Sequence, residues 1–150
     1  MKKRYPNDIG LWPQQMSESF REYWLSHGSK ECQHQNSDFK NSANKGKDRT
    51  RHCTRSLFTK KHSLSGEAFD LPWLCYSESQ GKLYCFICKL LSKTESNFTE
   101  GFCNWKKAGE KIDSYSKSQS HREALADAFV RSKTSSRIDK NLVQAIELES

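Results

Sequence analysis

Two cysteines separated by two residues constrain this chain more than any other feature of its sequence. Cys85 and Cys88 enclose Phe86 and Ile87. Thiolates at this spacing can bind one metal ion, and zinc accepts a tetrahedral arrangement of soft ligands without penalty. Two cysteines are half of such a site, and His121 is the only histidine further along the chain. The sequence therefore offers three zinc ligands, Cys85, Cys88 and His121, and leaves the fourth open.

The composition fits a small domain that a metal ion would help to stabilise. The chain has 150 residues, of which 34% are apolar and 29% charged, so it can bury little apolar surface. No apolar segment follows the basic first residues, and no run approaches the roughly 18 apolar residues of a membrane span. We therefore expect neither a signal peptide nor a membrane anchor. The six cysteines are then expected to be reduced thiols or metal ligands.

The pattern of apolar and polar residues divides the chain into four regions. Met16, Phe20 and Trp24 recur at helical spacing near the N-terminus, and Ile138 and Leu142 do so near the C-terminus. The stretch between the first helix and the centre is polar and rich in turn-forming residues, which predicts a linker. The predicted regions are an N-terminal helical segment (1–31), a polar linker (32–55), a folded centre (56–131) and a C-terminal helical tail (132–150).

The folded centre predicts a small α+β fold with a zinc-finger-like ββα core and helical and disordered flanks. Two apolar, aromatic-rich runs joined by a glycine-containing turn predict a β-hairpin over residues 73–86. Residues 120–131 predict a helix, in which Ser120 and Glu123 have the spacing of a capping box. The cysteines would then lie on the hairpin and His121 on the first turn of the helix. That is the arrangement of a ββα zinc finger.

A Cys-x-x-Cys pair is also found at redox-active sites, where it lies between a strand and a helix of a βαβ unit. The sequence predicts a hairpin at this point and no parallel sheet, which favours structural zinc. Two further pairs of neighbouring Cys and His residues occur, Cys32 with His34 and His52 with Cys53. Neither pair lies in a comparable arrangement of predicted strands and helix. Near Trp105, the spacing of Phe102 and Trp105 suggests two anchors on one helical turn.

Several segments, taken in order, match the pattern of one known family. They are residues 65–67, 72–77, 82–91, 101–108, 118–124 and 137–139, with a weaker match at 8–13. Together they resemble the TTF-type zinc finger found ahead of hAT-type transposase regions and in zinc-finger MYM-type proteins. The resemblance implies a zinc finger of transposon-derived origin with DNA as its ligand. In the family a catalytic and dimerisation region follows the finger, and the chain ends where that region would begin, so transposase activity is not expected.

One position departs from the family pattern, which has two histidines, the first six residues before the second. His121 matches the second histidine, and Tyr115 occupies the place of the first. A neutral phenol is a poor zinc ligand because its pKa is about 10. Three outcomes remain open: Cys103 supplies a fourth thiolate, water completes a three-ligand site, or the chain binds no zinc. A site completed by water would resemble catalytic zinc, which also needs a general base. No carboxylate lies in a recognisable motif beside these ligands in the sequence, so no enzymatic activity is predicted.

A run of basic residues accompanies the predicted finger helix. The net charge of +7 and the pI of about 9.1 suit a polyanionic ligand. The residues expected to contact phosphates are Lys106, Lys107, Lys111, Lys117 and Arg122. The predicted function is therefore that of a zinc-stabilised DNA-binding module with little sequence preference, located in the nucleus or, alternatively, the cytoplasm.

The alternative is a zinc-dependent protein-interaction module that does not bind DNA. This alternative rests on the apolar stripe over residues 138–148, which predicts a helix able to pair with another protein chain. Salt separates the two functions, because phosphate binding weakens steeply with salt concentration whereas apolar helix pairing does not.

Overall fold

The central β-hairpin predicted from the sequence is present and is almost wholly buried. In the computed structural model, which describes residues 5–47, 49–61, 64–134 and 138–149, strand β5 (Leu74–Ser77) pairs antiparallel with β6 (Lys82–Cys85). Leu74 lies opposite Cys85. Gly81 makes the turn with φ of 65°, a left-handed conformation that glycine adopts without strain. All four residues of β5 and the last three of β6 are buried, because other elements cover both faces of the hairpin.

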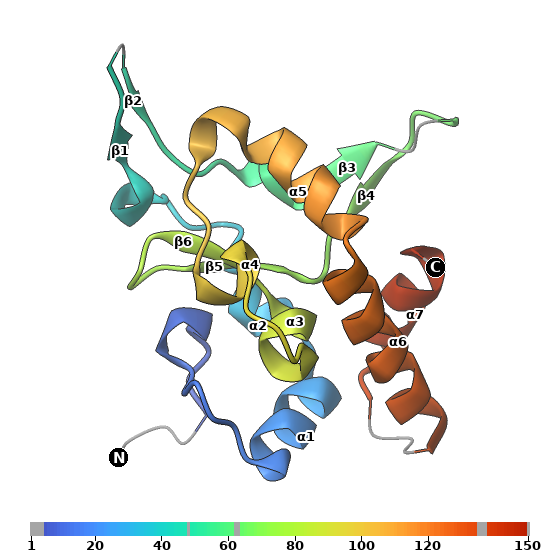
Figure 1. Cartoon of the computed structure of the whole chain (residues 1–150). Helices are drawn as coiled ribbons and strands as arrows, with labels where there is room; N and C mark the ends of the chain where they lie inside the picture. Colours follow the sequence, from blue (N-terminus) through green and yellow to red (C-terminus); the bar gives the residue numbers. More distant parts are fainter. Residues whose placement is uncertain (1–4, 48, 62–63, 135–137, 150) are drawn as a thin grey trace.

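Seven helices and three small antiparallel hairpins make up the described part of the chain, an α+β fold (Figure 1). The helices are α1 (Glu18–His27), α2 (Lys30–Gln33), α3 (Phe86–Leu91), α4 (Asn97–Glu100), α5 (Ala108–Ser116), α6 (Gln119–Thr134) and α7 (Lys140–Glu149). The other hairpins are β1 (Asn44–Lys45) with β2 (Thr50–Arg51) and β3 (Thr59–Lys61) with β4 (Ala68–Asp70). Short 3-10 turns are η1 (Ile9–Leu11), η2 (Lys40–Ser42), η3 (Arg55–Phe58) and η4 (Trp105–Lys107). None of the described helices has the length and apolar character needed to cross a membrane.

Helix α1 confirms the N-terminal helix predicted from its apolar stripe. The Ser17 hydroxyl accepts a hydrogen bond from the Phe20 N–H at 3.1 Å and so caps the helix. Gly28 ends it with φ of 93°. Phe20 and Trp24 are buried, and Trp12 packs against both of them. Trp12 and Trp24 also contact Phe86, the first residue of α3. The Arg21 side chain donates to the Leu90 carbonyl at 2.8 Å, so the N-terminal segment is docked on α3.

Residues 32–55, expected to be a polar linker, instead contain packed structure. Phe39 and Cys53 are buried, and the Cys53 N–H donates to the Ser42 hydroxyl at 2.8 Å. The buried indole of Trp105 donates to the Ser42 carbonyl at 2.6 Å. The linker was predicted from the polar composition of the segment. Composition does not reveal that its few apolar residues pack against distant parts of the chain. The segment thus forms part of the fold and supports the hairpin β1–β2.

Helix α6 confirms the helix predicted over residues 120–131, but its cap differs from the predicted one. The helix begins at Gln119, and the Ser118 hydroxyl accepts from the His121 N–H at 3.3 Å. Ser120 is therefore not the cap, and Glu123 instead accepts a hydrogen bond from the Gln119 side chain at 2.8 Å. The cap falls two residues earlier because a second serine precedes the one chosen from the sequence.

Phe102 and Trp105 do not share a helical turn, so that prediction is wrong. Phe102 forms an isolated β-bridge with Leu83, with backbone N–H···O distances of 2.8 and 2.9 Å, whereas Trp105 begins η4. The chain runs as an added short edge beside β6 before it turns into η4 and α5. Both aromatic side chains are nevertheless buried, as expected for core residues.

Helix α7 confirms a C-terminal helix, and it packs on α6 within the same chain (Figure 1). The Asp139 N–H donates to the Leu25 carbonyl at 2.9 Å, which ties the start of α7 to the end of α1. Leu142 is buried, so part of the apolar stripe proposed for a partner chain is used internally. The side chains of residues 145–149, which would complete the stripe, lie outside the described part.

Candidate metal centre

Cys85 and Cys88 lie where strand β6 passes directly into helix α3. Cys85 is the N-cap of α3, and its sulfur accepts a hydrogen bond from the Cys88 N–H at 3.4 Å. One turn of helix therefore brings both sulfurs to the same side of the chain. The pair was predicted to lie on the second strand of the hairpin, and helix α3 was not predicted. The short run of Leu90 and Leu91 after the cysteines was the signal for this helix.

His121 reaches the two cysteines from the first turn of α6, because α6 packs along α3. Its Nδ1 atom lies 3.5 Å from the sulfur of Cys85 and 3.6 Å from the sulfur of Cys88. The three ligand atoms lie within 4.8 Å of one another, and all three residues are buried. Among the described residues, no other group of three or more Cys, His, Asp or Glu side chains meets this condition.

These separations fit a tetrahedral zinc site. Zn–S bonds of about 2.3 Å and Zn–N bonds of about 2.0–2.1 Å at the tetrahedral angle place sulfur and nitrogen about 3.5 Å apart. The two observed S···N distances, 3.5 and 3.6 Å, match that edge. Two thiols and one imidazole are also the donor set that favours zinc among the common divalent ions. Cys85, Cys88 and Nδ1 of His121 could therefore hold a metal ion, and their separations fit zinc.

The two neighbouring thiols have pKa values that are shifted in opposite directions. Burial raises the pKa of Cys85 well above its ordinary value. The hydrogen bond from Cys85 lowers the pKa of Cys88, and hydrogen bonds with His121 and Tyr115 act in the same direction. One thiolate, on Cys88, is thus stabilised at the site by its neighbours.

Aromatic side chains enclose the site. The Trp73 ring lies 4.6 Å from the His121 ring, centroid to centroid, and the Tyr115 ring lies 5.2 Å from it. Phe98 lies 4.5 Å from Tyr115 and extends this wall. Trp73 was predicted only to begin the hairpin over residues 73–86. Its role at the site depends on the docking of α6, which the sequence pattern did not predict.

Tyr115 lies at the site, whereas Cys103 lies outside the three-ligand group. The Tyr115 phenol accepts a hydrogen bond from the Ser96 hydroxyl at 3.4 Å. Burial, followed by the nearby sulfurs, raises the pKa of Tyr115 far above its ordinary value, which keeps the phenol neutral. Cys103 is half-buried, and its carbonyl accepts from the Asn44 side chain at 3.3 Å. The residue that completes the wall of the site is thus Tyr115, as a hydrogen-bonding neighbour of Cys88.

All five residues expected to contact DNA are exposed, on η4, on α5, on α6 and at the C-cap of α5; they are Lys106, Lys107, Lys111, Lys117 and Arg122. Lys117 forms an ion pair with Asp113 at 3.3 Å. Lys60 forms a second ion pair with the same carboxylate, and these two contacts lower the pKa of Asp113. The charge of Lys117 is therefore partly neutralised within the chain.

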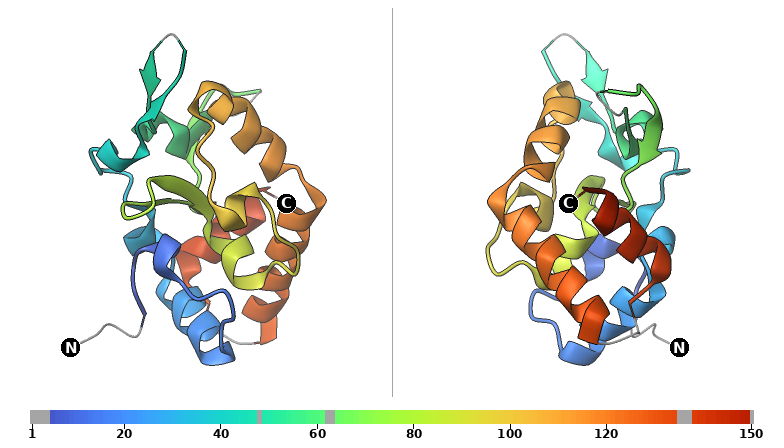
Figure 2. Two further views of the ribbon diagram at one scale, coloured as in Figure 1. Left: turned by 60° about the vertical axis from the view of Figure 1, so that its left-hand side comes forward. Right: turned by 90° about the vertical axis from the view of Figure 1, so that its right-hand side faces the viewer.

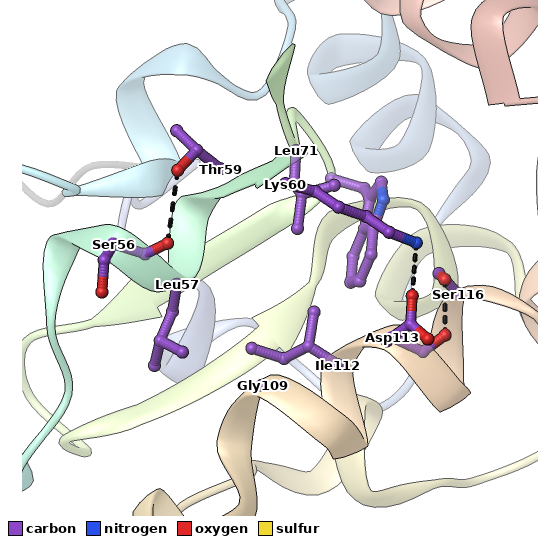
Figure 3. A pocket seen from close by; sticks show the side chains of 10 residues that line it. Ser56, Leu57, Thr59, Lys60, Leu71, Gly109, Ile112, Asp113 and Ser116 are labelled. Atoms are coloured by element: carbon purple, nitrogen blue, oxygen red, sulfur yellow. Dashed lines mark hydrogen bonds and ion pairs between the residues drawn. The ribbon is translucent and has the colours of Figure 1, made fainter. Parts of the chain in front are cut away.

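A small pocket lies beside these ion pairs, between η3, β3 and α5 (Figure 3). Its volume is about 120 Å³, and Leu57, Leu71, Trp73 and Ile112 provide its apolar lining. Figure 3 shows the Lys60–Asp113 ion pair at its edge. Ligand pockets usually measure about 300–1,000 Å³, so this one has room for about one apolar side chain. Trp73 separates it from the metal site, since the same indole packs on His121.

Comparison of the chain with models of protein families, with curated proteins and with solved structures finds no match.

Proposed function

We propose that this chain is a zinc-stabilised DNA-binding module of the nucleus, with weak sequence preference. The single observation that carries the proposal is the buried group of Cys85, Cys88 and His121, whose separations fit tetrahedral zinc. The exposed lysines on the elements that lead from β6 to His121 supply the second part of the argument. The resemblance of the motif series to TTF-type zinc fingers supports the same function.

Zinc would act here as a structural crosslink. It would join the β6–α3 junction, through Cys85 and Cys88, to the first turn of α6, through His121. Ligands this far apart in sequence meet only in the folded chain, so the binding free energy of the metal becomes folding free energy. In the proposed zinc-finger core, the end of β6 supplies the Cys85 thiolate, the first turn of α3 supplies the Cys88 thiolate and α6 supplies the imidazole. Helix α3, which carries Cys88, and the inserted helices α4 and α5 distinguish this core from a minimal ββα finger.

Tyr115, the residue that departs from the family pattern, lies at the proposed metal site. It occupies the position where the family has its first histidine, and its ring packs beside His121 at the site. We propose that the phenol acts as an outer neighbour that hydrogen-bonds the Cys88 thiolate, as partners of metal ligands commonly do. The fourth ligand of the zinc is then a small exogenous molecule such as water.

Three lysines form the proposed DNA surface: Lys106, Lys107 and Lys111, here called the η4–α5 lysines. All three are exposed, and no described acidic residue forms an ion pair with them. Unpaired cations of this kind bind phosphates with release of counterions, which makes affinity fall steeply with salt. Lys117 contributes less because Asp113 already holds it. Phosphate contacts position a protein on DNA but carry little sequence information, which explains the weak preference.

The test is a fluorescence-anisotropy titration of a labelled duplex with the zinc-loaded chain at several salt concentrations. Alanine at all three η4–α5 lysines should flatten the dependence of log affinity on log salt by about three units, one for each phosphate contact. The matched control replaces Lys30, Lys93 and Lys140, three exposed lysines on other elements, and should change the slope little. No binding at low salt, or equal effects of both triple variants, would reject the proposal in favour of the protein-interaction alternative.

A further inference from the structure

We propose that the hairpin β1–β2 is a basic arm that contacts the same DNA duplex as the η4–α5 lysines. This inference rests on the proposed function and adds a second contact surface to it. The arm comprises residues 44–47 and 49–51 of the described chain. Its residues were expected to be part of a polar linker, and the structure shows an antiparallel hairpin in which Lys45 lies opposite Thr50.

Positive charge is concentrated in and around this arm. Between residues 40 and 55 the chain has six lysines and arginines and one acidic residue, Asp48. Within the described arm, Lys45, Lys47 and Arg49 are exposed and Arg51 is half-buried. No described acidic side chain forms an ion pair with these four residues. Counted from the sequence, these four cations against Asp48 give residues 44–51 a net charge of +3, which suits an external polyanion.

The arm projects from the body of the molecule. It extends past α5 in Figure 1, and both views of Figure 2 show it at the end of the molecule opposite α1. A two-stranded ribbon of this kind fits the major groove of B-DNA, which is about 12 Å wide. All its described residues are polar or glycine, so it lacks the aromatic or aliphatic anchor on which protein–protein interfaces depend. Phosphate is the partner chemistry that its side chains match.

The base of the arm is fixed to the segment that carries the η4–α5 lysines. The Asn44 side chain donates to the Cys103 carbonyl at 3.3 Å, and Trp105, the first residue of η4, donates to the Ser42 carbonyl at 2.6 Å. Trp105 directly precedes Lys106 and Lys107. These hydrogen bonds fix the position of the base of the arm relative to the segment that carries the η4–α5 lysines. A single duplex could therefore contact both without a change in the fold.

The first test compares three full-length variants in the same salt-dependent anisotropy titration. Alanine at Lys45, Lys47 and Arg49 should flatten the salt slope by about three units and weaken binding at low salt. The variants of the η4–α5 lysines and of Lys30, Lys93 and Lys140 provide the comparisons. If only the η4–α5 variant lowers the slope, the arm is rejected and the proposed function stands. If the unchanged chain does not bind DNA at low salt, both proposals fail.

The second test needs no substitution. Brief acetylation of the zinc-loaded chain, with and without saturating duplex, is followed by mass spectrometry of each lysine. We expect DNA to slow the modification of Lys45 and Lys47 several-fold, and to leave Lys93 unchanged. Equal modification of Lys45 and Lys47 in the presence and absence of DNA, with protection at Lys106 and Lys107, would overturn the arm alone.

Discussion

Replacing Gly81 by alanine should destabilise this fold severely, for a reason visible only in three dimensions. A Cβ atom at Gly81 would lie 2.0 Å from the Asn41 carbonyl oxygen and 3.0 Å from the Ser42 nitrogen. Folded chains essentially never show such contacts under 3.0 Å, so the backbone at residues 41–42 would have to move by about 1 Å. The φ of 65° adds strain for any residue with a side chain, about 1 kcal/mol.

The displaced segment makes two buried hydrogen bonds that the movement would break. The Ser42 hydroxyl accepts from the Cys53 N–H at 2.8 Å, and the Ser42 carbonyl accepts from the Trp105 indole at 2.6 Å. Leaving a buried polar group without its partner costs about 1–3 kcal/mol. For two such groups, and with the backbone strain, the total loss should be about 3–7 kcal/mol. That is a large share of the roughly 5–15 kcal/mol that stabilises a typical domain.

Gly66→Ala is the matched control. Gly66 also has a positive φ, 73°, but no atom lies within 4 Å of the position of its Cβ. It should therefore lose only the strain, about 1 kcal/mol. Both variants would be unfolded with urea in zinc-containing buffer and followed by circular dichroism, with free energies from linear extrapolation. Equal losses for Gly81→Ala and Gly66→Ala would refute the close packing of the 41–42 segment on the β5–β6 turn.

Three further substitutions test the metal site and helix α5. Tyr115→His should tighten zinc binding in a chelator competition, because a neutral imidazole nitrogen replaces a neutral phenol beside the ligands; unchanged affinity would show that this side chain cannot reach the metal. Cys103→Ser should leave zinc affinity unchanged while Cys88→Ser abolishes it, since Cys103 lies outside the ligand group; weaker binding by Cys103→Ser would restore it as a ligand. Gly109→Ala should raise the free energy of unfolding by up to about 1 kcal/mol, because alanine favours a helix more than glycine does. This exposed position in α5 has nothing within 4 Å of the added Cβ, so a lower urea midpoint would contradict the packing of α5.

The hairpin and the longer helices could be predicted from the sequence because their signals are local. The apolar stripe of α1 and the two apolar runs of β5–β6 each depend on residues close together in the chain. The start of α6 was predicted to within a turn for the same reason, although Ser118 and not Ser120 caps it. The grouping of Cys85 and Cys88 with His121 was predicted from ligand spacing and chemistry. The structure brings these three residues together.

The parts that escaped prediction depend on contacts between distant segments. The docking of residues 39–53 relies on the hydrogen bond from Trp105 and on the close approach of the Asn41 backbone to Gly81. Neither contact can be predicted from the composition of that segment. The wall that Trp73 forms beside His121 likewise exists only once α6 lies along α3. The basic arm was overlooked because eight polar residues without apolar alternation carry no strand signal.

Counting the zinc bound per chain tests the central claim most directly. Elemental analysis of the purified chain should find about one equivalent of zinc, and Cys88→Ser should lose it. A chelator should then change the circular dichroism of the unsubstituted chain, because the proposed zinc ion would join α3 to α6. A chain without metal, whose circular dichroism is the same before and after chelator, would contradict the account.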